Sequence, residues 1–208
     1  GFCSACFCSD GAESLTTLIE SKSPARRGCQ TPRSSPFDVL TGARAIAAGA
    51  GHTCALTGSS AVRCWGDNSH YELDKLNSVS HLVPPTSTVH TIAAGGFTTC
   101  ALTVTGDVLC WGNYVEQAQL VLSGAKDIAV GDEHACAVMT TGGVRCWGSN
   151  TFGQLGDGTR TGRSTPPTSD VLTNVRSISA AGDHTCALME TGGVRCWGSN
   201  DYGQLGDG

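Results

Sequence analysis

The sequence is poor in charged side chains and has no long apolar run. Lys, Arg, Asp and Glu make up 15% of its 208 residues, too few to cover the exposed faces of a mainly helical protein. No stretch reaches the roughly 18 to 20 consecutive apolar residues that a membrane-spanning helix needs. Basic residues form no run longer than Arg26-Arg27, and the formal net charge is −5, so the long-range field repels phosphate backbones. We therefore expect neither a membrane span nor a nucleic-acid partner.

The sequence also lacks the residue constellations that carry common kinds of catalysis. It contains no G-x-S-x-G, no H-E-x-x-H and no phosphate-binding loop. Its acidic residues are not paired in a way that would separate their pKa values. We predict that the protein is not an enzyme and that it holds no cofactor and no metal.

Glycine and cysteine, by contrast, are abundant, with 28 and 12 residues. Eight of the cysteines form four pairs whose members lie ten residues apart, namely Cys54 and Cys64, Cys100 and Cys110, Cys136 and Cys146, and Cys186 and Cys196. The first members of successive pairs are 46, 36 and 50 residues apart, within the period of about 20 to 50 residues that is typical of propellers, solenoids and arrays. We predict four copies of one turn-rich, all-β unit.

Each copy has the pattern of a β-hairpin that a disulfide can close. In the third copy HACAVM and GVRCWG are short strands, and Gly142 stands where the turn needs a positive φ. The first copy has Ser60 at that place, so we expect its hairpin to turn differently. Counting back from the turn sets Cys136 opposite Cys146 at a non-hydrogen-bonded position, within reach of a disulfide.

Two other roles for the eight paired cysteines stay open at this point. They could be reduced core residues, as in cytosolic proteins, or zinc ligands, although two thiolates per hairpin supply only half of a tetrahedral site. Four independent pairs in disulfide register favour disulfides, and with them an oxidising compartment.

A strand of small residues precedes each hairpin, as ARAIAAG, VHTIAAG, AKDIAVG and VRSISAAG. Its alternation of Ile with Ala or Ser fits an inner strand that packs against a crowded axis. Each hairpin is followed by Trp-Gly and a polar loop. A copy therefore has the strand content of a propeller blade.

These residues resemble the RCC1-type repeat, which is named for the regulator of chromosome condensation. The pattern GxHTCALxxxGxVxCWGxNxxGQLG is matched at 182–206 and 131–156, and more weakly at 51–73 and 95–120. The resemblance covers about residues 42–208 and implies an RCC1-type β-propeller, of seven blades in this family, with Trp-Gly strands and Gly-Gln-Leu-Gly turns packed between blades. Because the fourth copy stops at GQLGDG, we expect about four blades of a larger ring, truncated at the C-terminal end. A four-bladed ring, or a half-ring completed by a second chain, is the alternative.

Some recurring polar residues suggest metal sites. Three histidines, His52, His134 and His184, share the position two before the first cysteine of a pair, but equivalent atoms of successive blades lie too far apart to share one ion. The resemblance favours a hydrogen bond within the blade to a neighbouring loop. Three aspartates in glycine-rich loops, Asp67, Asp157 and Asp207, lack the spacing of a calcium loop, and we expect them to be solvated turn residues.

Residues 1–37 do not belong to the repeat, and we predict a Cys-rich disulfide module or linker there, followed by the propeller blades at 38–208. The four cysteines of this segment, Cys3, Cys6, Cys8 and Cys29, allow two disulfides in any of three connectivities. A four-sulfur zinc site is the alternative.

Taken with the repeat and the paired cysteines, these patterns predict a non-catalytic extracellular propeller module, within a larger secreted or cell-surface protein, that binds a protein partner or builds an assembly from further copies or domains. A secreted inhibitor or receptor-type propeller that grips a protein on one face is the alternative, and guanine-nucleotide exchange is less favoured. The residues that we single out for partner binding are the aromatics of the loops after Trp-Gly, Tyr71, Tyr114, Phe152 and Tyr202.

Overall fold

The computed structural model describes residues 35, 38–73, 88–113 and 115–207. The chain divides into two compact units, Gly1–Thr41 and Gly42–Gly208, and every strand of the described residues lies in the second. These residues form no helix, and accordingly none that could cross a membrane. The predicted Cys-rich module at 1–37, with Cys3, Cys6, Cys8 and Cys29, lies outside the described residues apart from Ser35, so it and its boundary stay predictions.

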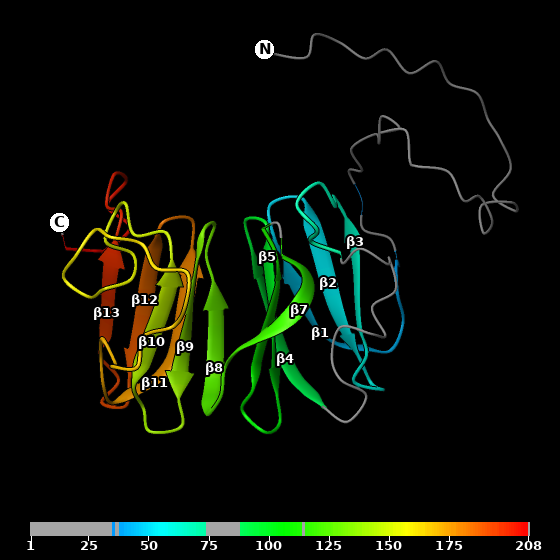
Figure 1. Cartoon of the computed structure of the whole chain (residues 1–208), viewed down its shortest axis with the longest axis horizontal. Coiled ribbons are helices and arrows are strands. Elements are labelled where there is room, and N and C mark those ends of the chain that lie inside the picture. The colour runs from blue at the N-terminus through cyan, green and yellow to red at the C-terminus, as the bar shows by residue number, and fades with distance from the viewer. Residues whose placement is uncertain (1–34, 36–37, 74–87, 114, 208) are drawn as a thin grey trace, which may run out of the picture. The chain divides into compact units, whose positions relative to one another are not determined.

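The strands of Gly42–Gly208 form four antiparallel sheets, which the chain visits one after another (Figure 1). We call the sheets blades 1 to 4. Blade 1 comprises β1 (Ala43–Ala48), β2 (His52–Thr57) and β3 (Val62–Gly66); blade 2 comprises β4 (Val89–Gly95), β5 (Thr98–Thr103), β6 (Val108–Gly112) and β7 (Val115–Leu122); blade 3 comprises β8 (Ala125–Val130), β9 (His134–Met139) and β10 (Val144–Gly148); and blade 4 comprises β11 (Val175–Ala181), β12 (His184–Met189) and β13 (Val194–Gly198).

The first strand of each blade lies at a common axis. Strand β4 contacts β1 on one side and β8 on the other, and β8 also contacts β11. The C-terminal ends of these four strands and the residues after them surround one small cavity, lined from the four blades by residues 48–50, 94–96, 130–132 and 180–182. The prediction that the small-residue strands are the inner strands of a β-propeller is therefore confirmed.

Glycine permits the closest approach of two blades at this axis. A Cβ atom built on Gly96 would collide with the backbone carbonyl of Asp132 on blade 3, and one built on Gly95 would collide with the carbonyls of Val130 and Gly131. Side chains at these two positions of blade 2 would force the inner strands apart.

All four hairpins have the same turn, including the first. The N–H of Gly142 donates to Met139 O (2.8 Å), and the N–H of Ser60 donates to Thr57 O (2.9 Å). Ser60 takes φ +64°, close to the +84° of Gly142, and its Oγ accepts a hydrogen bond from Arg44 Nη2 (3.1 Å). The expectation that the first hairpin turns differently was wrong, because the turn hydrogen bond and the one from Arg44, sixteen residues away in sequence, hold a non-glycine residue in the left-handed region.

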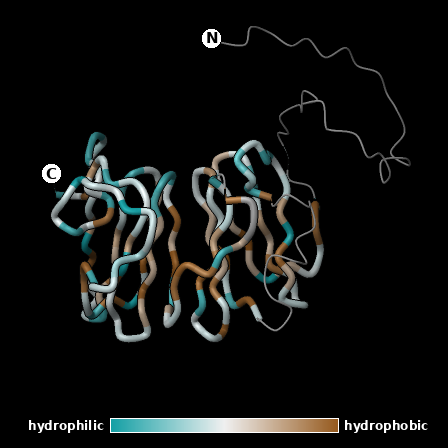
Figure 2. The backbone as a smooth tube through the Cα atoms, viewed as in Figure 1, coloured by the Kyte–Doolittle hydropathy of each residue, from teal (hydrophilic) through white to brown (hydrophobic). Residues whose placement is uncertain are grey.

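The hydrophobic core lies between adjacent blades. One cluster joins residues of blades 1 and 2, a second joins blades 2 and 3, and a third joins blades 3 and 4. The hydrophobic stretches follow the strands, whereas many of the loops at the ends of the blades are more hydrophilic (Figure 2). The contacts between blades therefore hold the fold together.

Candidate functional site

Four disulfides cross the four hairpins. They are Cys54–Cys64, Cys100–Cys110, Cys136–Cys146 and Cys186–Cys196, with Cα–Cα distances of 4.0 to 4.1 Å. In each hairpin the two cysteines are direct cross-strand partners. These are the pairs that the ten-residue spacing predicts, and because each sulfur is bonded to another sulfur, none is available to a metal.

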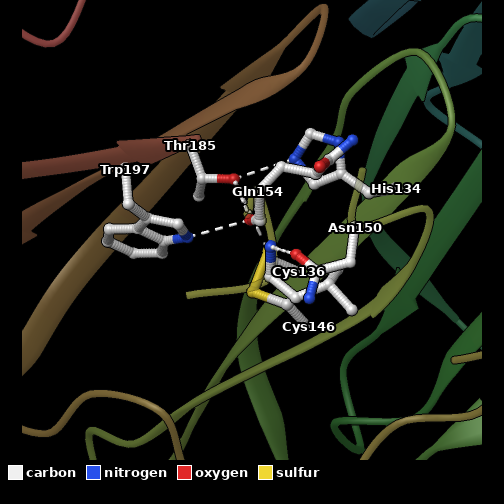
Figure 3. The surroundings of a disulfide bond; sticks show 8 residues. His134, Cys136, Cys146, Asn150, Gln154, Thr185 and Trp197 are labelled. Carbon is white, nitrogen blue, oxygen red and sulfur yellow. Dashed lines mark hydrogen bonds between the residues drawn. A yellow bond between two sulfur atoms is a disulfide. The ribbon is translucent and has the colours of Figure 1, made fainter. Parts of the chain in front are cut away.

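The junction of blades 3 and 4 is closed by two buried residues from the loop after β10, and Figure 3 shows one of them, Gln154, beside Thr185 and Trp197 of blade 4. Gln154 and Leu155 are both fully buried, and we call this pair the plug. The loop is held in shape by Asn150, whose Oδ1 accepts from the N–H of Leu155 (3.0 Å). The backbone carbonyl of Gln154 accepts two hydrogen bonds from blade 4, from Thr185 Oγ1 (3.0 Å) and from Trp197 Nε1 (2.9 Å).

The junction of blades 1 and 2 is built in the same way. Asn68 Oδ1 accepts from the N–H of Leu73 (2.9 Å), and the carbonyl of Glu72 accepts from Trp111 Nε1 (2.8 Å). Glu72 is almost fully buried. A turn that presents one backbone carbonyl to the tryptophan of the next blade is thus the common element of both junctions.

The recurring histidines contact the next blade. His134 Nε2 lies 2.8 Å from Thr185 Oγ1, and His52 Nε2 lies 2.7 Å from Thr99 Oγ1. Since the hydroxyl proton of Thr185 is donated to the carbonyl of Gln154, His134 must donate from Nε2. The expectation of a hydrogen bond within the blade was therefore wrong. The threonine that pairs with each histidine lies on the second strand of the neighbouring blade.

Both histidines are poor bases in this environment. Burial, and to a smaller extent the neighbouring His184, lower the pKa of His134 to about 4. Its Nδ1 is buried and has no hydrogen-bond partner in the described part of the chain, so a proton there would not be stabilised. Burial also lowers the pKa of His52, although Glu72 and Asp67 oppose that shift. No cluster of metal-ligating side chains occurs in the described residues.

The junction of blades 2 and 3 departs from this pattern. Blade 2 has Thr98 at the histidine position and blade 3 has Ala135 at the threonine position, so both partners of the His–Thr bond are replaced together. The chain after β6 continues into β7, which pairs with β6. A cavity of about 290 Å³ opens here between Trp111 of blade 2 and Trp147 of blade 3.

The aromatic residues expected to bind a partner do not occupy one equivalent position. The Asn–Leu hydrogen bonds align Phe152 with Tyr202 and with His70, whereas Tyr71 aligns with Gly153 and takes φ +64°. Phe152 is 41% exposed and Tyr202 is 95% exposed.

The histidine that aligns with Phe152 contacts the next blade. The ring of His70 stacks on that of Phe97, with 4.1 Å between the centroids. The fourth of the aromatic residues singled out in the sequence, Tyr114, lies outside the described residues.

The aspartates of the glycine-rich loops hold those loops together. Asp157 accepts from Thr159 and Asn150 and pairs with Arg163, and the Thr159 hydrogen bond is the main cause that lowers its pKa. With only 11% of its side chain exposed, Asp157 is not the solvated residue that we expected. Asp207 of blade 4 is exposed and accepts from Asn200 Nδ2 (2.8 Å).

The inter-blade partners of the histidines were missed at the level of sequence. Thr99 and Thr185 each directly follow the histidine position of their own blade, so the pattern His-Thr-Cys contained a signal. A comparison of the copies could have revealed it. Where one blade has Thr98 instead of the histidine, the next blade has Ala135 instead of the threonine.

Four sheets arranged around an axis, with buried tryptophans between them, define a β-propeller. The regulator of chromosome condensation (RCC1) repeat model matches residues 43–72, 89–113, 125–154 and 175–204, and a second model of the same repeat matches 141–188. Because these matches cover more than half of the chain, the protein belongs to the RCC1 repeat family. No curated protein gives a significant match to the sequence.

Solved structures show the same fold. Prp20p from Saccharomyces cerevisiae is 26% identical, with a TM-score of 0.67 over 77% of this chain and 45% of that one. Human WBSCR16 is 22% identical, with a TM-score of 0.72 over 88% and 56%. The ectodomain of the receptor kinase CR4 from Physcomitrella patens is 28% identical, with a TM-score of 0.51 over 72% and 39%. The chain spans about half the length of these relatives.

Proposed function

We propose that this propeller is a non-catalytic, extracellular protein-binding module of a larger secreted or cell-surface protein. The observation that carries the proposal is the recurrence of one disulfide in each of four consecutive blades. Disulfides persist in oxidising compartments and are rare where thiols are kept reduced. A bond that recurs at the same place in every blade is a stabilising element of the fold, since catalytic thiols are normally single and exposed.

The similarities to solved structures support the same reading. CR4, at 28% identity, is a receptor kinase whose solved structure is an ectodomain. Prp20p, at 26% identity, has been studied for its binding to Gsp1p and histones, so this fold serves protein recognition there. The RCC1 repeat family consists mostly of non-enzymatic binding proteins and exchange factors. The net charge of −5 and the disulfides count against a nuclear exchange factor and against a nucleic-acid partner.

One face of the propeller offers a groove of suitable character for a protein partner. It has a volume of about 330 Å³ and combines two phenylalanines, Phe97 and Phe152, with acidic residues that include Asp132 and Glu133. Both acidic side chains are exposed. Aromatic and acidic groups together favour a partner segment that carries lysine or arginine next to an apolar side chain.

The extracellular location is tested by peptide mapping of the native protein without reduction. We expect four disulfide-linked peptides with the pairings found here. Recovery of these eight cysteines as free thiols would overturn the proposed compartment, whatever the protein binds.

The binding role is tested by titration with a lysine-rich peptide, with an acidic peptide of equal length as the control ligand. The variant Asp132→Asn/Glu133→Gln should weaken binding of the basic peptide at least tenfold. The control variant Thr141→Lys/Thr191→Lys changes the net charge by the same amount at two exposed hairpin turns and should have a much smaller effect. Equal losses in both variants would mean that total charge, rather than the groove, attracts the peptide.

A further inference from the structure

The cavity between blades 2 and 3 has the same surroundings as the plug of the next junction. Leu155 packs in one cluster with Cys146 of its own blade and with Trp197 of the following one. The cavity is lined by Cys110 and Trp147, which are the equivalent residues one junction earlier. Its volume of about 290 Å³ lies just below the range of about 300 to 1,000 Å³ that is typical of ligand pockets.

The tryptophan at this cavity has a hydrogen-bond donor that meets no acceptor in the described part of the chain. Trp111 and Trp197 donate from Nε1 to the backbone carbonyls of Glu72 and Gln154 on the preceding blades. Trp147 is 8% exposed, and its Nε1 has no hydrogen-bond partner among the residues that the structure describes. His134 Nδ1 is the sole described side-chain nitrogen or oxygen that is fully buried and unpartnered. The Trp147 N–H therefore keeps contact with solvent, consistent with its position at a cavity wall.

Three departures from the repeat coincide at this one place. Blade 2 continues into β7 where the other three blades form a turn closed by an Asn–Leu hydrogen bond. In addition, Thr98 replaces the histidine and Ala135 replaces the threonine. Each change removes a group that fills or closes the equivalent junction. The remaining lining combines apolar residues, including Val115 and Val121 of β7, with a few polar residues such as Thr98.

We propose that this cavity is a peptide-binding site, which accepts from a partner protein a turn of the Gly-Gln-Leu type that takes the place of the missing plug. The bound turn would present a backbone carbonyl to Trp147 Nε1 and an aliphatic side chain to the space beside Cys110 and Ala135. This inference deepens the proposed protein-binding role and rests on it. The type of peptide is inferred from the chain itself, because Gln154 and Leu155 fill the equivalent space at the junction of blades 3 and 4.

The test uses a synthetic peptide with the sequence of residues 149–158, SNTFGQLGDG, and ¹H–¹⁵N spectra of the oxidised protein. The indole N–H signal of Trp147, assigned with the variant Trp147→Phe, should shift in a saturable manner. A control peptide with Ala in place of its Gln and Leu should bind at least tenfold more weakly. Absence of a Trp147 shift, or equal shifts with both peptides, would overturn the proposal.

Variants distinguish this cavity from other places where the peptide could bind. Trp147→Phe keeps an aromatic ring, although a smaller one, and loses the N–H donor. Gln119→Phe fills the cavity from an exposed position on β7. Each variant should lower the affinity at least tenfold. Trp65→Phe changes the equivalent indole of blade 1 and should change the affinity less than twofold. Loss of binding in Trp65→Phe alone would show that the peptide docks on blade 1, and would overturn the proposal.

A variant that binds the peptide more tightly gives a further test, because misfolding would weaken binding and could not produce a gain of affinity. Ala135→Thr restores the hydroxyl that, as Thr185, donates to the plug carbonyl of the next junction. One added hydrogen bond should tighten peptide binding about fivefold, and an unchanged or weaker affinity counts against the geometry proposed. If the SNTFGQLGDG peptide fails while the basic peptide still binds the acidic groove, the cavity inference falls and the proposed function stands.

Discussion

The imidazole of His134 on blade 3 is hydrogen-bonded to the hydroxyl of Thr185 on blade 4, with 2.8 Å between Nε2 and Oγ1. The same hydroxyl donates to the carbonyl of Gln154, which also accepts from Trp197. Four residues from two blades thus form one continuous chain of hydrogen bonds around a single backbone oxygen. In a propeller whose core lies between blades, such a chain contributes directly to global stability.

Replacing Thr185 by Val should destabilise the protein. The substitution keeps the shape of the side chain but leaves the buried N–H of His134 without an acceptor, at a cost of about 1 to 3 kcal/mol in the free energy of unfolding. Thr53→Val is the matched control, because Thr53 holds the equivalent position of blade 1 and is less buried; it should change stability by less than about 0.5 kcal/mol. Urea unfolding without reductant measures both. Equal losses of stability in the two variants would show that the hydrogen bond between Thr185 and His134 does not stabilise the fold.

Acidification should weaken the fold through His134. Its pKa is about 4 in the folded state and 6.5 unfolded, so the unfolded chain takes up a proton first as the pH falls below 6.5. Between about pH 7 and pH 5 this histidine should lower the free energy of unfolding by about 2 kcal/mol, and stability should level off above about pH 7. His52, whose pKa is also lowered, acts in the same direction.

The variant His134→Gln tests this assignment of the pH dependence. The Gln amide can donate a hydrogen bond but does not titrate. Chemical unfolding at a series of pH values should therefore show a smaller loss of stability between about pH 7 and pH 5 than in the unaltered protein. An unchanged slope would assign the pH dependence to other groups.

Removing one disulfide by Cys136→Ser/Cys146→Ser should cost about 3 kcal/mol, because the closed loop no longer restricts the unfolded chain. The separation is ten residues in all four pairs, so this entropic cost is the same for each. The double variant of Cys186 and Cys196, whose surroundings are more exposed, should therefore lose a similar amount in urea unfolding. A loss that follows burial instead would show that packing around the sulfurs dominates.

Gly96→Ala should be far more harmful than Gly182→Ala. The two glycines hold the same position in blades 2 and 4 and take φ +41° and +52°, so the added methyl strains the backbone at both by about 1 to 2 kcal/mol. At Gly182 the new atom meets nothing, whereas at Gly96 it collides with the carbonyl of Asp132. Thermal unfolding should separate the two variants clearly, and similar midpoints would refute the close contact of blades 2 and 3.

The repeat made the fold predictable, and the departures from it were where prediction failed. The ten-residue spacing placed Cys136 opposite Cys146, because strand pairing has a fixed register once the turn is located. The turn at Ser60 was misjudged because a hydrogen bond from Arg44, sixteen residues away in sequence, is not a local signal. The hydrogen-bond partners of His52 and His134 lie 47 and 51 residues further along the chain, and the pattern within one copy does not contain them.

The disulfides also define how the chain would respond to a pulling force. Each of the four described bonds joins two strands of a single blade, so tension could separate neighbouring blades by breaking only non-covalent contacts. The segment inside each closed loop could not lengthen, which withholds about 30 Å of extension per blade. A tether built from such blades would yield in steps of unequal length, because the segments between successive closed loops differ in length, and it would stiffen well before the chain is drawn straight.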